Sequence, residues 1–403
     1  FRTAALFQEA WTIPLRYGTG REKNNFSFSM FSNKPRIIVD KNTVDELLSR
    51  GVDMVYPDKD WLRTQLMSGR RLRIYTGWDP TSTDVHIGHT VWIWKLRAFQ
   101  ELGHEVIVLM GTFTATLGDP TGKESARKAM TLDETRKNAE SFKKKTAKIF
   151  DVKNNPITIR ENHKWLAEMS FSDVIKLASH FTVQQMLERD MFEKRREAGE
   201  PIGLHEFFYP LMQGYDSVAM EVDLEVGGTD QTFNMLAGRT LVRQMQGREK
   251  GVLTLKLITD AAGKKIGKSE GNAINIDAEP TDLYGKVMTL ADETIWTVFE
   301  QCTPLALSDI ALWKNEMEND PRRAKAKLAF EIVKLYNDET AARAAEEAWN
   351  RQFRDGEVPV NMQSFSIRPH MLFVDALVES GLCSSKGDAR RQIEQNGVKL
   401  DGE

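Results

Sequence analysis

Short apolar runs alternate with amphipathic stretches from Pro35 to about residue 280. Runs rich in Val, Ile and Leu are typical of buried strands, and they lie at Arg71–Tyr75, Glu105–Met110, Pro156–Arg160, Val222–Val226 and Val252–Ile258. Stretches with an apolar residue every three or four positions predict helices over His86–Leu102, Thr131–Phe150 and Phe171–Arg196. This alternation predicts an α/β domain built on a doubly wound parallel sheet. Ligands bind such sheets at the carboxyl ends of the strands, so the loops that follow strands are the first place to look for chemistry.

The pattern changes towards the end of the chain. Strand signals fade after about Ile276, and Thr281–Phe353 has a helical pattern throughout, whereas Gly356 and Pro359 make Arg354–Ile367 typical of a linker. We therefore expect an α/β domain over 35–280, a helical domain over 281–353, a linker over 354–367 and a small terminal unit over 368–403.

Residues 1–34 mix Gly, Ser, Asn and basic residues and differ from the rest of the chain. One interpretation is that Met30 is the true start and that the preceding stretch is a leader or a non-native extension. The alternative is an organellar transit peptide, which the acidic Glu9 and Glu22 disfavour. The first interpretation predicts a cytoplasmic protein and the second an organellar matrix protein.

Composition excludes several classes of protein. The 403 residues are 41% hydrophobic and 28% charged, as in ordinary globular proteins, and the formal net charge is −3. A net charge this small gives the whole protein only a weak electrostatic potential, so an anionic partner would have to bind at local basic patches. The apolar runs fall far short of the roughly 18 residues that a membrane span needs. Two cysteines can form neither a disulfide framework nor a Cys-x-x-Cys zinc site, so we expect a reducing compartment and no structural metal.

The segment from Tyr75 to His89 is the first candidate for chemistry, because it follows a strand and opens a helix. A helix N-terminus suits an anion such as a phosphate. His86 and His89 share one helical face and could donate to phosphoryl oxygens, and Gly88 leaves room for a ring or a sugar beside the backbone. The alternative is that both histidines are ordinary surface or zinc-binding residues; the other histidines are scattered, which disfavours zinc.

A glycine-rich loop with lysines, from Ala262 to Ser269, is the second candidate. It resembles a loosened P-loop, but the residues after Ser269 lack a helical pattern. A mobile loop that brings Lys265 and Lys268 to a triphosphate is the favoured interpretation. A merely solvated basic loop is the third.

Two glycine turns and one helical face complete the candidates. Gly118-Asp119 and Gly228-Thr-Asp230-Gln231 follow predicted strands, and each could hold a sugar hydroxyl or an ammonium group, or simply cap a helix. Tyr209, Gln213 and Asp216 recur at helical spacing on an otherwise apolar helix, where unpaired polar groups are costly. They form either a self-satisfied internal network or a site for a polar ligand.

These motifs resemble the class I aminoacyl-tRNA synthetases. His86-Ile-Gly-His89 is similar to the HIGH signature of that family, and Lys265-Ile-Gly-Lys268-Ser269 is similar to its KMSKS loop. Tyr75-x-Gly-x-Asp79-Pro-Thr, the two glycine turns and the helix from Tyr209 to Asp216 resemble the tyrosyl-tRNA synthetases in particular. The resemblance covers about Lys41 to Glu403 and implies a Rossmann-like catalytic domain followed by a helical domain on the anticodon side.

The resemblance also implies an activity and roles for individual residues. L-Tyrosine and ATP, with Mg²⁺, would give tyrosyl-adenylate and pyrophosphate, and the tyrosyl group would pass to the terminal ribose of tRNA(Tyr). The residues implied to bind tyrosine are Tyr75, Asp119, Tyr209, Gln213, Asp216 and Gln231. Those implied to bind ATP are Asp79, Gly88, Gly228, Asp230 and Ser269. Those implied to act on the phosphates are Thr81, His86, His89, Lys123, Arg127, Lys265 and Lys268.

The end of the chain resembles part of an S4-type RNA-binding fold, and its implied RNA contacts are Lys386, Arg390 and Arg391. The family resemblance further implies a homodimer, with the interface near Phe171–Phe192. Three alternatives stay open at this point: a tryptophanyl-tRNA synthetase, a tRNA- or intron-binding relative without catalysis, and a P-loop NTPase.

Overall fold

The computed structural model describes residues 35–119, 130–259, 265–267, 271–353, 365–395 and 397–398. Six strands form one sheet in the order β1-β6-β5-β2-β3-β4. Neighbouring strands from β6 to β4 run parallel, as predicted, whereas β1 pairs antiparallel with β6. The strands are β1 (Val52–Tyr56), β2 (Arg73–Trp78), β3 (Glu105–Met110), β4 (Thr158–Glu161), β5 (Leu224–Gly228) and β6 (Gly251–Leu255).

The predicted parallel sheet is therefore confirmed, with one antiparallel edge strand, β1, that was not predicted. The sequence pattern missed β1 because this edge strand buries only Val55 fully and exposes Asp53 and Met54, so it lacks the apolar run of a central strand. The predicted strand from Val252 also ends earlier than expected, at Leu255.

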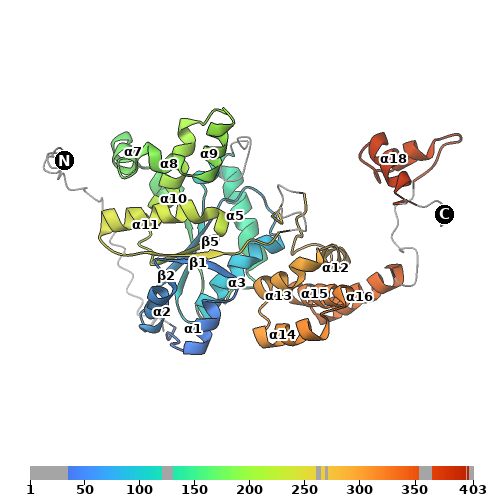
Figure 1. Ribbon diagram of the computed structural model, residues 1–403, viewed down its shortest axis with the longest axis horizontal. Helices are drawn as coiled ribbons and strands as arrows, with labels where there is room; N and C mark the ends of the chain where they lie inside the picture. The colour runs from blue at the N-terminus through green and yellow to red at the C-terminus, as the bar shows by residue number, and fades with distance from the viewer. Residues whose placement is uncertain are drawn as a thin grey trace, which may run out of the picture.

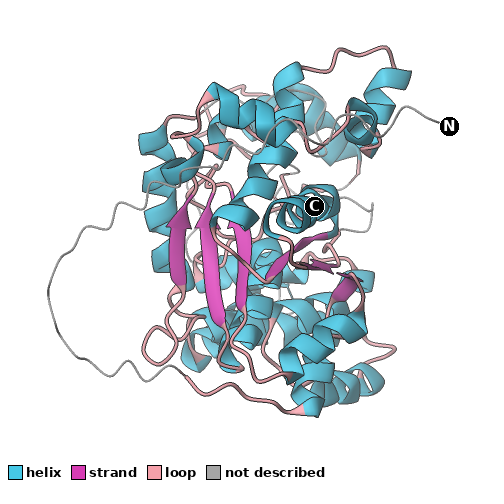
Figure 2. Ribbon diagram, turned by 90° about the vertical axis from the view of Figure 1, so that its left-hand side faces the viewer, coloured by secondary structure: helices cyan, strands magenta, loops and turns pink. Residues whose placement is uncertain are grey.

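Eleven helices among the described residues surround the sheet. They are α1 (Lys41–Leu47), α2 (Lys59–Met67), α3 (Ile87–Glu101), α4 (Thr114–Leu117), α5 (Leu132–Thr146), α6 (His163–Leu166), α7 (Phe171–Ala178), α8 (Val183–Leu187), α9 (Asp190–Glu197), α10 (Phe208–Ala219) and α11 (Thr232–Gln246). Figure 1 shows α11 above the sheet and α1 and α2 below it, and Figure 2 shows helices on both sides of the strands. α3 and α5 confirm two predicted helices.

The predicted helix over Phe171–Arg196 is wrong as a single element, because three short helices occupy this stretch. Thr182 is the reason for the first break: its hydroxyl accepts from the Gln185 amide, and the Gln185 side chain accepts from the Thr182 amide. This reciprocal capping box starts a new helix in the middle of an amphipathic pattern.

Alternation along the strands sorts the core into two faces of the sheet. Ile74 of β2 belongs to the large apolar cluster that also includes Leu96 of α3, whereas Tyr75 packs on the opposite face with Ile107 and Val222. On that face, Gly214 of α10 and Gly238 of α11 lie so close that a Cβ on Gly214 would stand 3.1 Å from the Gly238 nitrogen. Small residues thus let α10 and α11 pack tightly over the strand ends.

Five helices follow the sheet: α12 (Pro280–Met288), α13 (Ile295–Cys302), α14 (Leu307–Glu316), α15 (Pro321–Tyr336) and α16 (Glu339–Phe353). They confirm the predicted helical stretch, and Val298 of α13 and Leu328 of α15 belong to the same apolar cluster as α3. The Cys302 thiol donates to the carbonyl of Ile87, the first residue of α3.

The last two helices, α17 (Phe373–Glu379) and α18 (Lys386–Glu394), enclose a small cluster of their own that includes Leu377, Cys383 and Ala389. Ser385 caps the start of α18, because its hydroxyl accepts from the Asp388 amide. No described helix has the length and apolar character that crossing a lipid bilayer requires.

His104, just before β3, should make the free energy of unfolding depend on pH. It is fully buried, it accepts from the Leu72 amide at 3.3 Å, and burial lowers the pKa of its imidazole from 6.5 to about 4. Between those two values the unfolded chain binds more protons than the folded one, so the free energy of unfolding falls as the pH falls from about 6.5 towards 4. We expect a His104→Gln variant to show a smaller fall over this range than the unmodified protein in urea titrations. Parallel curves would show that His104 does not contribute.

Candidate active site

The two signature segments meet at the carboxyl end of the sheet. The Ile87 amide, at the start of α3, donates to the Ile274 carbonyl at 2.9 Å, and the Ile276 amide donates to the Val85 carbonyl at 3.0 Å. The chain after the lysine loop is thus bonded to the chain that opens α3. Segments nearly two hundred positions apart in the chain therefore lie side by side.

Gly88 makes the close approach of these segments possible. A Cβ on this residue would stand 2.8 Å from the Ile266 carbonyl oxygen, closer than any real Cβ contact. The Ile266 carbonyl therefore narrows the space in which we expected a ring or a sugar to lie.

His86 and His89 form a stacked pair with ring centroids 3.7 Å apart. His89 Nδ1 accepts from the His86 amide at 3.3 Å, which places the proton of a neutral His89 ring on Nε2. Burial lowers the pKa of His86 to about 4, with a further contribution from Lys265, and burial followed by the charges of His86 and Lys265 lowers the pKa of His89 well below its usual range. Both rings are neutral near pH 7 and each can donate one hydrogen bond.

Lys265 extends from the loop to Asp230, with Nζ 2.7 Å from the carboxylate Oδ2. Asp230 belongs to the turn that follows β5, so the loop lysine, the histidine pair and this turn lie at one edge of the sheet. Lys265 is half-exposed, which leaves its ammonium accessible to a ligand.

Asp216 of α10 is a buried carboxylate at the site, with 2% of its surface exposed. Trp165 donates to its Oδ1 at 2.7 Å and Asn162 to its Oδ2 at 3.2 Å. Burial raises the pKa of Asp216 well above the usual range, although these two donors oppose the shift. Tyr75, fully buried on β2, lies on the same side of the sheet, and the charge of Asp216 contributes to its raised pKa after burial and Glu225.

A second group of carboxylates surrounds Tyr209. Its hydroxyl donates to Asp79 Oδ2 at 2.8 Å, and Thr114 donates to the other Asp79 oxygen at 2.7 Å. Burial raises the pKa of Tyr209 well above its usual range, and the charges of Asp79, Asp119 and Asp216 add to the shift. This concentration of negative charge suits an ammonium group.

Asp119 joins that group through two further partners. Gln231 donates to its Oδ2 at 2.8 Å, and the Arg189 guanidinium lies 3.4 Å from its Oδ1. Gln231 in turn accepts from Asn234 at 2.9 Å, so its amide orientation is defined.

Tyr209, Gln213 and Asp216 lie on one face of α10, as their spacing predicts. All three also have partners within the protein, because Gln213 donates to Glu225 at 3.1 Å. The two interpretations of this face are thus compatible, because side chains that have partners within the protein can still offer further hydrogen bonds to a ligand.

Several residues at the site were missed by the sequence analysis. Asn162 and Trp165 follow β4, so a search of every loop after a strand would have found them. Glu225 is a carboxylate within the apolar run of β5, and a charged residue in a buried strand indicates a paired or functional group. Lys250 and Arg189 offered no local signal, because only their distant partners reveal them.

The remaining predicted residues are placed as follows. The Thr81 amide donates to the Asp79 carbonyl at 2.7 Å, and a Cβ on Gly228 would collide with Asp230 Oδ1 at 2.5 Å. Lys123, Arg127, Lys268 and Ser269 lie outside the described residues. Residues 271–279 contain no helix, and α12 begins only at Pro280, which disfavours the P-loop alternative.

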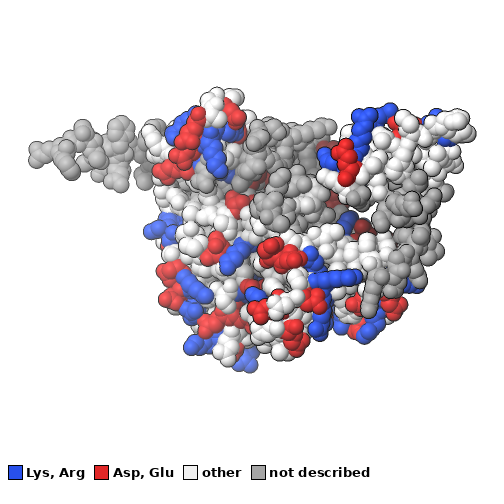
Figure 3. Space-filling view, turned by 45° about the vertical axis from the view of Figure 1, so that its right-hand side comes forward, with Lys and Arg blue, Asp and Glu red and all other residues white. Residues whose placement is uncertain are grey.

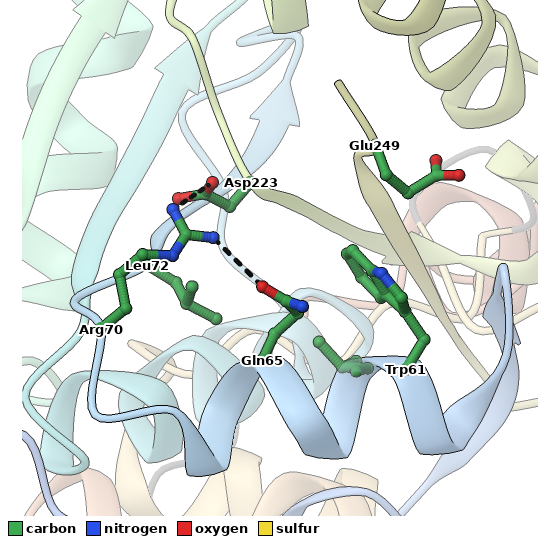
Figure 4. A pocket seen from close by; sticks show the side chains of 7 residues that line it. Trp61, Gln65, Arg70, Leu72, Asp223 and Glu249 are labelled. Atoms are coloured by element: carbon green, nitrogen blue, oxygen red, sulfur yellow. Dashed lines mark hydrogen bonds and ion pairs between the residues drawn. The ribbon is translucent and has the colours of Figure 1, made fainter. Parts of the chain in front are cut away.

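A pocket on the other side of the molecule is not part of this site. It is lined by Trp61, Gln65, Arg70, Asp223 and Glu249 among others, and Figure 4 shows Arg70 between Asp223 and Gln65. Arg70 and Asp223 come just before β2 and β5, at the amino ends of the strands. Ligands of doubly wound sheets bind at the opposite ends.

Comparisons with known proteins agree with this geometry. Residues 67–354 match the family described as tRNA synthetases class I (W and Y). The chain is 43% identical to a tyrosine–tRNA ligase of Photobacterium profundum over 358 residues, which is 88% of this chain and 90% of the relative. It is 42% identical to that of Haemophilus influenzae, with 91% of each chain covered. This chain belongs to the tyrosyl-tRNA synthetases.

A solved structure supports the same conclusion. The C-terminally truncated mitochondrial tyrosyl-tRNA synthetase of Coccidioides posadasii superposes with a TM-score of 0.63 at 26% identity, covering 76% of this chain and 92% of that one. The protein is thus an aminoacyl-tRNA synthetase of class I, an enzyme that uses ATP as a substrate. Its relatives favour tyrosine over the tryptophan alternative.

Proposed function

We propose that this synthetase performs its two steps at the carboxyl end of the sheet, with the residue roles given below. Tyrosine and ATP form tyrosyl-adenylate and pyrophosphate, and the tyrosyl group then passes to the 3′-terminal ribose of tRNA(Tyr). The observation that carries the proposal is the meeting of the histidine pair, Lys265 and the carboxylate-lined face of α10 at one edge.

The histidines and the loop lysine act on the phosphates. The carboxylate of tyrosine is already a nucleophile, so the first step needs no general base. Negative charge grows on the α-phosphate in the transition state, and fixed donors stabilise it. Neutral His86 and His89 supply N–H groups, and Lys265, together with Lys268, Lys123 and Arg127, supplies positive charge for the leaving pyrophosphate.

The carboxylates of the site hold tyrosine. Asp119 and Tyr209 hold its ammonium group, with Gln213 beside them, while Tyr75 and Asp216 meet its phenol. The carboxylate and ribose region is lined by Asp79, Gly88, Gly228, Asp230 and Gln231, and Thr81 lies on the phosphate side. Ser269 is assigned to ATP by the resemblance of its loop alone.

Mg²⁺ accompanies ATP in this proposal. The described residues gather no group of three His, Cys, Asp or Glu side chains that could hold a metal ion. In nucleotide sites Mg²⁺ is usually bound by the phosphates, by water and by one or two carboxylates. The ion would neutralise part of the triphosphate charge.

The helical domain and the terminal unit would bind tRNA. Lys386, Arg390 and Arg391 are exposed on α18. Lys386 Nζ lies 2.7 Å from Asp375 Oδ1, and Arg391 Nη2 lies 2.6 Å from Asp388 Oδ1. RNA phosphates would have to compete with these carboxylates. Figure 3 shows acidic and basic side chains side by side on the face that it draws, consistent with recognition by local patches.

Amino-acid-dependent exchange of pyrophosphate into ATP tests the proposal on the full 403-residue chain. We expect exchange with tyrosine, and little with tryptophan or phenylalanine. Exchange that depends on tryptophan would favour the tryptophanyl alternative. The absence of exchange with any amino acid, in a folded protein that binds tRNA, would favour the non-catalytic relative.

We further propose that the enzyme is a homodimer. Large apolar side chains are exposed on the helices where an interface is expected: Phe171 is 81% exposed, Val183 is 64% exposed and Ile175 is 54% exposed. Phe171 and Ile175 are one turn apart on α7 and so share a face. Exposed apolar surface of this kind is typical of association sites.

A Phe171→Asp variant is expected to shift the protein from dimer to monomer, because a charge buried in an apolar interface is costly. Light scattering coupled to size-exclusion chromatography measures the mass. Leu312→Asp is the matched control, since Leu312 is 56% exposed on α14, outside the proposed interface. A monomeric unmodified protein, or equal effects of both changes, would contradict this interface.

Tyrosyl-tRNA synthesis takes place where translation does, so we propose a cytoplasmic enzyme, or one of the organellar matrix if residues 1–34 act as a transit peptide.

A further inference from the structure

A buried ion pair lies next to Tyr75, one of the two residues assigned to the substrate phenol. Glu225 of β5 and Lys250, just before β6, have side chains that are 1% and 0% exposed, and Lys250 Nζ donates to Glu225 Oε2. Neither residue has a role in the mechanism above. Taking two charges out of water is expensive, and apolar replacements are often as stable. Stability alone therefore does not explain why this position holds an ion pair.

Strand register places this pair beside Tyr75. Glu225 is the register partner of Tyr75 across β5 and β2, so their side chains point to the same face of the sheet. The Lys250 ammonium lies 5.7 Å from the centre of the Tyr75 ring. A Cβ on Gly238 would stand 2.8 Å from both Lys250 Nζ and Ser217 Oγ, so the glycine on α11 leaves the space that the cluster occupies.

Glu225 connects the ion pair to both ends of the proposed tyrosine site. One of its oxygens, Oε1, accepts from Gln213 Nε2 at 3.1 Å, and the other accepts from Ser217 Oγ at 3.4 Å. Ser217 in turn lies 2.8 Å from the Tyr75 hydroxyl. Two side chains assigned to the substrate, Gln213 and Tyr75, are thus each linked to the same carboxylate.

The charge on Glu225 determines the direction of these hydrogen bonds. A carboxylate paired with an ammonium accepts only, so Ser217 donates its single proton to Glu225 and accepts from Tyr75. Tyr75 then donates its proton to Ser217 and accepts the single proton of the substrate phenol. Asp216 can therefore meet the phenol oxygen only as a donor, in its protonated form, which its burial favours. By the same logic Gln213 gives its amide N–H₂ group to Glu225, which leaves its carbonyl oxygen to accept from the substrate ammonium.

We propose that the Glu225–Lys250 pair is a specificity-determining element that orients Tyr75 as an acceptor for the phenol hydroxyl and Gln213 as an acceptor for the ammonium group. This inference rests on the proposed function. Both residues are positioning residues, because they act through Ser217, Tyr75 and Gln213. Loss of the pair should weaken binding of any amino acid at the ammonium end, and should weaken recognition of tyrosine relative to phenylalanine at the phenol end.

The test compares kcat/KM for tyrosine and phenylalanine in pyrophosphate exchange. We call the hydrogen bonds from Tyr75 to Ser217 and from Ser217 to Glu225 the relay. Glu225→Gln combined with Lys250→Met removes both charges and lets an amide donate to Ser217, which would reverse the direction of these hydrogen bonds. We expect the tyrosine-to-phenylalanine ratio to fall about tenfold, the effect of one weakened hydrogen bond, through a higher KM for tyrosine and an unchanged KM for ATP.

The chain offers a matched control one position away. Arg239, next to Gly238 on α11, pairs with Glu249, next to Lys250, at 2.8 Å, but this pair is partly exposed and is not bonded to Tyr75 or Ser217. Arg239→Met with Glu249→Gln should leave the ratio unchanged. A fall of the ratio in this control would show that the effect is structural.

A Tyr75→Phe background isolates the relay. Without the Tyr75 hydroxyl, the same double change should alter the ratio by less than about twofold, because coupled residues are not additive. Equal falls in both backgrounds, or no fall with Tyr75 present, would overturn the proposal. If the double variant fails to fold, Ser217→Ala cuts the relay without touching either charge, and an unchanged ratio in that variant would overturn the proposal as well. Failure of the unmodified enzyme to use tyrosine would instead contradict the proposed function.

Discussion

His86→Ala is expected to lower the rate of tyrosine-dependent pyrophosphate exchange by about 10²- to 10³-fold, the usual effect of removing one donor to a developing oxyanion. The affinity for tyrosine should stay nearly unchanged. His86 stands at the start of α3, stacked on His89 and away from the carboxylates around Tyr209 in our assignment. In the proposed mechanism its neutral ring donates to the phosphate mainly as charge grows there, so we expect the loss to fall on kcat.

Single-turnover formation of tyrosyl-adenylate measures the rate, and equilibrium dialysis with tyrosine measures binding. His205→Ala is a suitable control, because His205 is exposed just before α10 and has no assigned role. An equal loss of rate and of tyrosine affinity in His86→Ala would contradict the assignment of His86 to the phosphates.

Asp216→Ala is expected to reduce the preference for tyrosine over phenylalanine by about 10- to 100-fold. A buried polar group left without its partner costs about 1–3 kcal/mol, and about 1.4 kcal/mol is a factor of ten. In this variant the phenol hydroxyl of tyrosine loses a partner, while phenylalanine has no hydroxyl to lose one. Trp165 and Asn162 also lose their acceptor, so the thermal stability of the variant should fall as well.

The ratio of kcat/KM values for the two amino acids separates the two effects, because a loss of stability lowers both values together. Asp223→Asn provides a control at the opposite end of the sheet, where Asp223 pairs with Arg70 (Figure 4). An unchanged ratio in Asp216→Ala would refute the assignment of Asp216 to the phenol.

Local patterns predicted much of the fold because their physical causes are local. Apolar runs predicted β2 to β6, and helical periodicity predicted α3, α5 and the polar face of α10. The same patterns failed where a tertiary or capping effect prevails. The edge strand β1 lacks an apolar run because one side of it meets water, and the capping box at Thr182 divides a stretch whose periodicity is otherwise continuous.

The candidate site was predictable only in part, for a similar reason. Loops that follow strands and open helices can be found along the chain, and this is how His86, Asp119 and Asp230 were identified. Arg189 and Lys250 were not found, because a buried charge is defined by its partner, and Asp119 and Glu225 are distant in the chain. Gly88 was found, but its contact with the Ile266 carbonyl was not.

By itself the sequence determined the alternation of strands and helices, the chemistry present in each loop and the family to which the chain belongs. The tertiary structure alone decided that β5 lies next to β2 while β3 lies on the other side, so that the chain passes outward from β2 through β3 to β4 and then returns to β5. Strand order depends on pairing between residues far apart in the chain, which no local pattern records. That order places Glu225 beside Tyr75 and brings the lysine loop to the histidine pair.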